Sequence, residues 1–159
     1  MKIKVKEIIK GCAPIRSNGE LSDCFDLRLA EDINLKKGDI YVARLGVAMQ
    51  LPKGMIARVY SRSSNPSKQH IGIANGVGYI DNAYRGNMDE WRAPIIAYQD
   101  VALKKGTRIC QFEVVPSQFA SWIQKLKWLF SSKINLIFVS EFSSGNNRGG
   151  IGEGTKNVR

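Results

Sequence analysis

The sequence predicts an all-β protein, a sandwich or a barrel, with one amphipathic helix near 117–131 and a glycine-rich tail. Short apolar stretches with alternating polarity are separated by turn signals at intervals of roughly eight to twelve residues, which is typical of such folds. Strands do not alternate with helices, and no internal repeat is present. A chain of 159 residues with 43% hydrophobic residues is large enough for one domain with a single core.

The first strand is expected at 2–6, KIKVK, where Ile3 and Val5 share one face and the intervening lysines favour an edge position. The segment 41–51 is rich enough in apolar residues to form one longer strand. The remaining strands are expected within 24–30, 56–64, 72–87, 93–106 and 107–115.

The segment 119–130 departs from this pattern because its large apolar residues recur at helical spacing. They are Phe119, Trp122, Ile123, Leu126, Leu129 and Phe130. The favoured interpretation is a helix packed on the sheet. A partner-binding or self-association face and an interfacial membrane helix stay open, since residues 117–133 contain three lysines and no acidic residue, and Trp128 lies off the apolar stripe.

Charge and composition restrict the classes of function. The 24 Lys and Arg residues against 14 Asp and Glu residues give a net charge of +10, which favours a polyanionic partner. Because the basic residues are scattered, no nucleic-acid partner is expected. No apolar run is long enough to span a bilayer and the first residues lack a secretory signal, so a cytoplasmic location is expected.

Cysteine and histidine usage argues against several kinds of site. Cys12, Cys24 and Cys110 are an odd number and form no C-x-x-C pair, which argues against a disulfide framework and a zinc site. His70 is the only histidine, so one chain cannot assemble a histidine-based triad.

The stretch 76–87, GVGYIDNAYRGN, places Asp81 directly after an apolar strand and among glycines. Glycines allow sharp bends and the close approach of another molecule. Asp81 is therefore interpreted either as a polar hairpin tip or as a carboxylate that faces a ligand.

The C-terminal segment 143–159 is predicted to be a mobile arm, separate from a β domain at 1–142. In the arm, Arg148-Gly149-Gly150 pairs a guanidinium with flexible amides that can wrap a phosphate. A simple disordered tail is the alternative.

Five stretches occur in an order that resembles the homotrimeric deoxyuridine triphosphatases, the dUTPases, over nearly the whole chain. They are DL at 26–27, SRSS at 61–64, NGVGYIDNAYRG at 75–86, RICQF at 108–112 and RGGIG at 148–152. The first continues as DLR-x-AED, the form found in Gram-positive, phage and gut-bacterial members. The resemblance implies a distorted jelly-roll barrel and the hydrolysis of dUTP to dUMP and pyrophosphate, which keeps uracil out of DNA and supplies dUMP for dTMP synthesis.

The resemblance also implies residue roles. Asp81 is the general base that activates water at the α-phosphorus, and Tyr84 packs under the deoxyribose. Uracil is read by Asn75 and the backbone of Gly78, Tyr79 and Ile80, while the phosphates meet Arg62, Ser63, Ser64 and Gln111. Asp26 supports Mg²⁺ through water. Arg148, Gly149, Gly150 and Ile151 close over the substrate from a third subunit, which requires a homotrimer.

Two departures from the family pattern set the open questions. Ile151, Glu153 and Gly154 alter the closing motif, which puts closure of the arm in doubt. The basic segment 117–133 is longer than the usual link and has no assigned role. Two alternatives to the enzyme follow: a dUTPase-like regulatory or binding protein that uses this helix on a membrane or partner, and a dCTP deaminase relative.

Overall fold

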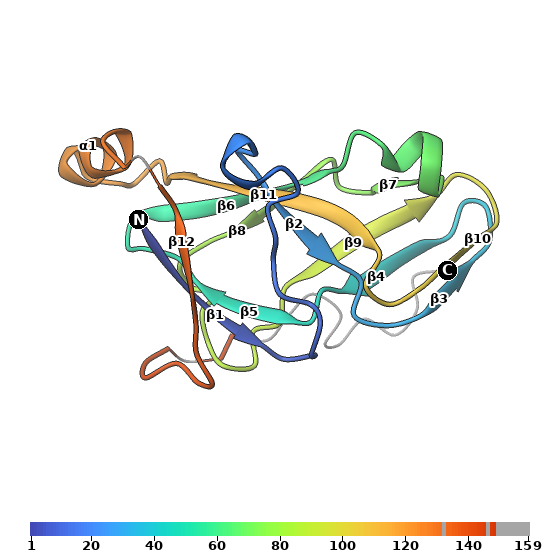
Figure 1. Cartoon of the computed structure of the whole chain (residues 1–159), viewed down its shortest axis with the longest axis horizontal. Helices are drawn as coiled ribbons and strands as arrows, with labels where there is room; N and C mark the ends of the chain where they lie inside the picture. The colour runs from blue at the N-terminus through green and yellow to red at the C-terminus, as the bar shows by residue number, and fades with distance from the viewer. Residues whose placement is uncertain (132, 146, 149–159) are drawn as a thin grey trace.

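The computed structural model describes residues 1–131, 133–145, 147 and 148 (Figure 1). Twelve strands are found there: β1 (Lys2–Glu7), β2 (Phe25–Arg28), β3 (Ile33–Leu35), β4 (Ile40–Arg44), β5 (Val47–Gln50), β6 (Met55–Ser61), β7 (Ile71–Ile73), β8 (Val77–Ile80), β9 (Arg92–Ala97), β10 (Val101–Leu103), β11 (Arg108–Pro116) and β12 (Asn135–Phe138). Helical segments are η1 (Gly19–Leu21), η2 (Asn65–Gln69) and α1 (Trp122–Leu129). The all-β prediction with one α-helix is confirmed.

The described strands form four sheets around a shared core, with the orders β2-β11-β6-β8, β4-β9-β7, β12-β1-β5 and β10-β3. All pairings are antiparallel except that of β1 with β12. Within the described residues the sheets stay separate and do not close into one continuous barrel.

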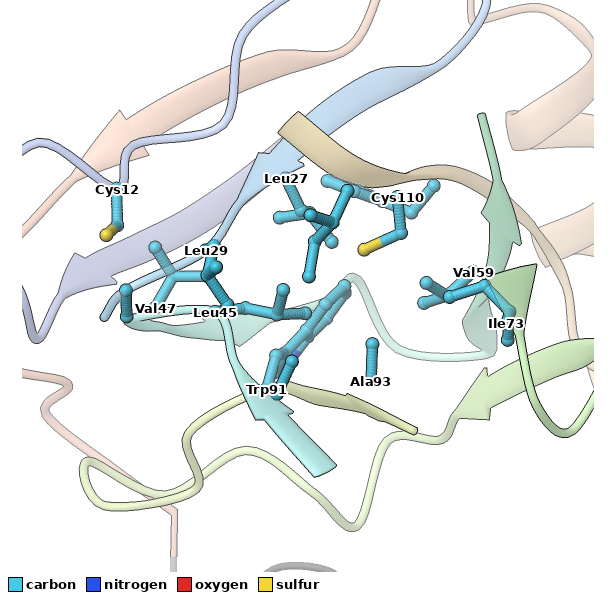
Figure 2. Close-up of a cluster of buried hydrophobic side chains, with 14 of the residues drawn as sticks. Cys12, Leu27, Leu29, Leu45, Val47, Val59, Ile73, Trp91, Ala93 and Cys110 are labelled. Atoms are coloured by element: carbon cyan, nitrogen blue, oxygen red, sulfur yellow. The ribbon is translucent and has the colours of Figure 1, made fainter. Parts of the chain in front are cut away.

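The core is centred on Trp91, which is fully buried and surrounded by Leu27, Leu45 and Ala93 (Figure 2). The Trp91 ring meets Phe112 edge-on at 5.2 Å, and Phe112 stacks on Phe25 at 5.4 Å between centroids. Such aromatic pairs contribute about 0.5–1.5 kcal/mol beyond the area they bury. This cluster fixes β2 and β11 against the loop that carries the candidate site.

β1 has the predicted alternation, since Ile3 and Val5 are fully buried and Lys2 and Lys4 are exposed. The expected edge position is wrong. β12 adds to one side of β1 in parallel and β5 adds to the other side antiparallel, so β1 lies in the middle of its sheet (Figure 1). The lysines mark its solvent face and not an open edge.

The single long strand expected at 41–51 is also wrong, because β4 and β5 are separated at Leu45 and Gly46. Gly46 has a φ of +67°, which ordinary residues rarely adopt. Its carbonyl accepts hydrogen bonds from Ile8 N at 2.8 Å and Ile9 N at 3.0 Å. The turn sends β4 to one sheet and β5 to another.

α1 forms where predicted and begins with a capping box, in which the side chains of Ser121 and Gln124 bond each other's backbone amides. The helix projects from one end of the molecule (Figure 1). The predicted packing of its apolar stripe on the sheet is wrong: Trp122 is 70% exposed and Leu129 is 66% exposed.

Trp128 makes the contact with the body of the protein instead. Its indole Nε1 donates to the carbonyl of Val114 at 3.0 Å, and its ring packs against the core. The helix therefore turns its predicted inner face to solvent. None of the helices that the structure describes is long and apolar enough to cross a membrane.

Candidate active site

Asp81 directly follows β8, as the sequence predicts, and its carboxylate side chain is 59% exposed. Its Oδ1 accepts a hydrogen bond from the amide of Ala83 at 2.8 Å, which closes a tight local turn. A guanidinium nitrogen of Arg148 lies 3.2 Å from Oδ2. The carboxylate is thus held in orientation by the backbone while remaining open to water.

β8 is an edge strand of its sheet, bonded to β6 on one side. An edge strand presents unpaired backbone donors and acceptors, so the outer side of Gly78, Tyr79 and Ile80 can read the edge of a planar base. Asn75 and Gly76 form the preceding turn, where Gly76 has a φ of +72° and the amide of Val77 donates to the carbonyl of Asn75 at 2.8 Å.

Tyr84 lies in the loop after Asp81 and packs against the core with its ring half-buried. Its hydroxyl donates to the carbonyl of Glu90 at 2.6 Å. The carboxylate of Glu90 is buried and accepts from Arg44 Nε at 2.9 Å and Gly46 N at 3.0 Å. The ring of Tyr84 is therefore anchored to the backbone of Glu90, whose own carboxylate is buried and paired with Arg44.

Asp26 lies on β2, is 4% exposed and is surrounded by donors. Its Oδ1 accepts from Arg62 Nε at 2.9 Å, and its Oδ2 lies 3.2 Å from a guanidinium nitrogen of Arg108 and accepts from the hydroxyl of Ser17. Gln111 on β11 pairs in register with Asp26 on one side and Tyr60 on the other. A second polar cluster is thus assembled on β2, β11 and β6.

Arg62, Ser63 and Ser64 follow β6 and lead into η2. This turn is fixed by Asn65, which is fully buried. Its side-chain Nδ2 donates to the carbonyl of Ile109 at 2.5 Å and to Ser61 Oγ at 3.2 Å. The hydroxyls and the guanidinium beside it are consequently presented by a rigid loop.

The two clusters lie at opposite ends of the same strand pair. Ile80 pairs with Ala57, whereas Arg62 follows five residues after Ala57. Five extended residues span about 17 Å. Asp81 and Arg62 of one chain are therefore too far apart to contact the same small ligand group. The predicted residues do not form one site within a single chain.

Phe142, Asn147 and Arg148 of the tail contact the loop 85–89. Phe142 and Asn87 exchange two hydrogen bonds, at 2.8 Å and 3.3 Å. Asn147 Oδ1 accepts from Met88 N at 2.8 Å, and the buried carboxylate of Asp89 accepts from Arg148 N at 2.7 Å. Arg148 thereby reaches Asp81 of its own chain. Gly149, Gly150, Ile151, Glu153 and Gly154 lie outside the described residues.

Sequence reasoning missed Asp89 and Arg108. Asp89 also accepts from Gly86 N at 2.7 Å, so one buried carboxylate holds both the loop and the arm. The signal available was an acidic pair directly before an apolar tryptophan, Asp89-Glu90-Trp91, where a buried carboxylate needs donors. Arg108 had no comparable signal, since its partner Asp26 is distant in sequence.

Thiol chemistry is disfavoured at this site. The three cysteines are free, and burial raises the pKa of the Cys12, Cys24 and Cys110 thiols. Protonated thiols are poor nucleophiles and poor metal ligands at neutral pH.

Known proteins resemble this chain in sequence and in fold. A family model described as dUTPase matches residues 15–126. A prophage-derived deoxyuridine 5′-triphosphate nucleotidohydrolase of Bacillus subtilis is 38% identical over 157 residues, which cover 98% of this chain and 100% of the relative.

Solved structures agree with the match. The dUTPase of Streptococcus mutans superposes with a TM-score of 0.64 at 27% identity, over 70% of this chain and 91% of that chain. A mutant dUTPase of the Staphylococcus aureus phage phi11, described with a structural Mg(II) ion, shares the fold with a TM-score of 0.64 at 20% identity, over 75% of this chain and 93% of that chain. The resemblance drawn from the five sequence motifs is therefore confirmed, and the chain belongs to the dUTPase family.

Proposed function

We propose that this chain hydrolyses dUTP to dUMP and pyrophosphate, with Asp81 as the general base for a water that attacks the α-phosphorus. The observation that carries the proposal is the position of Asp81, a solvent-open carboxylate at the end of an edge strand. A positioned carboxylate contributes about 10²–10⁴ in rate as a general base. The proposed role is to remove dUTP, keeping uracil out of DNA, and to supply dUMP for dTMP synthesis.

Substrate choice is proposed to rest on β8 and Tyr84. The outer backbone of Gly78, Tyr79 and Ile80 hydrogen-bonds the uracil edge, with Asn75 at the turn. Cytosine presents the opposite donor and acceptor pattern and leaves buried groups unpaired, at about 1–3 kcal/mol each. Tyr84 packs under the sugar and leaves no room for a 2′-hydroxyl, and its anchor on the Glu90 carbonyl supports this role.

The phosphate chain is proposed to meet Arg62, Ser63, Ser64 and Gln111 of a neighbouring copy in a homotrimer. The separation of about 17 Å between the two ends of the β6–β8 pair supports this arrangement, because it places the phosphate-binding residues of one chain beyond its own Asp81.

The arm 143–159, including Gly149, Gly150 and Ile151, is proposed to close over the bound substrate. Arg148 and Asp81 are both more than half exposed, and an exposed ion pair of this kind is weak. A triphosphate therefore competes readily for Arg148 and releases Asp81 for catalysis. The family resemblance implies a third subunit as the source of the arm, whereas the contact found here is within one chain.

Mg²⁺ is proposed to accompany the substrate. Both carboxylate oxygens of Asp26 already accept from cationic groups or a hydroxyl, so Asp26 fits a water-mediated role and not direct ligation. In the part of the chain that the structure describes, no three His, Cys, Asp or Glu side chains cluster as a metal cage. When bound, the ion would neutralise charge on the phosphates, which supply most of its ligands.

The test is pyrophosphate release from dUTP, with UTP, dCTP and dTTP in parallel, with and without Mg²⁺. We expect release from dUTP alone, lost in Asp81→Ala and retained in Asp23→Asn, which removes an exposed carboxylate elsewhere. Release or deamination of dCTP would instead support the deaminase alternative. An intact, folded protein without turnover on any substrate would contradict the proposal and favour a binding protein.

A further inference from the structure

The inserted segment 117–133 borders Asp81. A cavity of about 330 Å³ has the loop after β8 on one side and the start of α1 on the other. Its lining includes Lys53, Asp81, Asn82, Ser117, Phe119 and Gln124. The segment without an assigned role is therefore a wall of the space beside the proposed general base.

The turn between β5 and β6 holds the two walls together. The side-chain Nδ2 of Asn82 donates to the carbonyl of Pro52 at 3.1 Å and also to that of Met55. From the other side, Ser117 N donates to the carbonyl of Gly54 at 2.8 Å. The Asp81 loop and the segment before α1 are thus both hydrogen-bonded to the same turn, one through the Asn82 side chain and one through the Ser117 backbone.

Gly54 brings the helix closer still. A Cβ built on Gly54 would lie 2.5 Å from the Gln124 side chain, and its φ of +80° is one that glycine adopts easily. The same Gln124 caps α1 through Ser121 N at 2.8 Å. A side chain at position 54 would strain the backbone and push the Gln124 side chain away from this turn.

The lining chemistry suits part of a nucleotide. Lys53 is exposed and lines the same cavity as Asp81. Its ammonium group would attract a negatively charged phosphate chain bound there. Phe119 borders the same cavity and is 87% exposed in this single chain, so its ring is accessible to a ligand there. A nucleotide in the cavity would cover this ring and pair with the ammonium group.

We propose that this cavity is a substrate subsite, in which Lys53 contacts a phosphate oxygen of dUTP and Phe119 covers the sugar–phosphate portion. The proposal rests on the proposed dUTP hydrolysis and assigns the inserted segment to the substrate site. Asp81 remains the general base, and the two new residues act in binding.

The test uses two variants, each with a matched control in the segment 117–133. Lys53→Met removes the charge and keeps most of the stem, and Lys125→Met does the same on α1 away from the cavity. Phe119→Ala removes the ring, and Phe130→Ala removes an equally apolar ring, 80% exposed, at the opposite end of α1. We expect Lys53→Met and Phe119→Ala to raise the KM for dUTP about five- to tenfold, with kcat within about twofold of the parent.

Ionic strength supplies a second readout that loss of structure would not mimic. If Lys53 contacts a phosphate, the rise of KM with salt becomes shallower in Lys53→Met but not in Lys125→Met. Binding of a non-hydrolysable α,β-imido dUTP, measured by calorimetry, separates binding from chemistry, and circular dichroism checks the fold.

Unchanged KM and analogue affinity in both variants, with an active parent protein, would overturn the subsite and leave the proposed function intact. Equal effects in the controls would also overturn it, since the insertion would then act through general structure. A parent protein that neither binds the analogue nor hydrolyses dUTP would overturn the proposed function and the subsite together.

Discussion

The single position Gly86 controls how the arm docks on its own chain. A Cβ built there would lie 2.6 Å from the Cα of Asn147 and 2.7 Å from its amide nitrogen. Both distances are shorter than any stable contact, and both involve backbone that has little room to shift. The docking of residues 147 and 148 therefore depends on the absence of a side chain at position 86.

We predict that Gly86→Ala releases the arm from its own chain. Because Asn147 and Arg148 lose their hydrogen bonds to Met88 N and Asp89, trypsin should cleave after Arg148 about fivefold faster. Met88→Ala is the control, since it changes an exposed side chain and keeps the backbone donor. Equal cleavage rates in the variant and the parent would show that the arm does not rest on this loop in solution.

At the scale of elements, the pair β3 and β10 is clamped at both ends by the same device. Lys36 pairs with Asp100 at 2.8 Å, and Lys104 pairs with Asp32 at 2.8 Å. Each aspartate also accepts from the next residue's amide, Lys37 N or Lys105 N, at 2.9 Å and 2.8 Å. The lysine hydrogen bonds lower the pKa of both Asp32 and Asp100.

Because the pKa values of Asp32 and Asp100 are lowered in the folded protein, its stability should depend on pH. A lowered folded pKa adds stability above the unfolded aspartate pKa of about 3.9, and this contribution disappears as the pH falls through the folded pKa. The double variant Asp32→Asn, Asp100→Asn should therefore melt below the parent at about pH 6, and the gap should shrink below about pH 4. The effect is small because both pairs are exposed. A gap that widens in acid would contradict this account, with Asp23→Asn as the control.

The C-terminal arm is expected to be needed for turnover and not for folding. Truncation after Gly145 removes Asn147 and Arg148 and leaves β12 and the anchor at Phe142 in place. We expect turnover of dUTP to fall at least about tenfold while the melting temperature and the oligomeric state stay unchanged, because no core residue is lost. Full turnover in the truncated protein would show that closure is dispensable. The division into a domain at 1–142 and an arm at 143–159 would then lose its functional basis.

The elements differ in how far sequence could predict them. Alternation located β1 correctly because Ile3 and Val5 pack on one core, but its neighbours depend on β12, more than a hundred residues away. Helical spacing located α1, yet periodicity identifies an apolar face without stating what covers it. Trp128 makes the packing contact by bonding Val114 of β11. That contact depends on how α1 is placed relative to β11, which helical periodicity does not specify.

In the site as well, sequence predicts what is local and does not predict contacts between distant segments. Asp81, Tyr84 and the glycine turn at 76 are local, and the motif placed them on one strand and loop. The cluster of Asp26, Arg62 and Arg108 joins three strands, so the ion pairs could not be predicted from any single stretch. The break at Gly46 was hidden because a single glycine inside an apolar run is compatible with a strand as well as a turn.

At the scale of the whole molecule, the separation of Asp81 from Arg62 makes the proposed site a property of the assembly. In a trimer with shared sites, each site takes Asp81 from one copy and Arg62 from another. Two inactive variants, Asp81→Ala and Arg62→Ala, should therefore complement each other when they are co-expressed. Random assembly of equal amounts should restore about one quarter of the sites.

The measurement is the turnover of co-purified mixed trimers against each variant alone. Sites built within one chain would give no recovery, because every chain in the mixture lacks one required group. Mixing the separately purified trimers without subunit exchange is the control, and it should also give no recovery. The outcome distinguishes shared sites from sites that merely lie in a trimer.

The parallel pairing of β12 with β1 has a consequence for the nascent chain. β1 ends at Glu7, whereas its partner β12 ends at Phe138, so β1 leaves the ribosome long before β12. At about 5–20 residues per second, synthesis of the intervening chain takes on the order of ten seconds. Once β5 has been made, β1 can pair with β5 but not yet with β12, so this sheet is two-stranded and open along one side. Chaperone demand during translation should therefore concentrate on β1 and β5, and it should fall when β12 arrives.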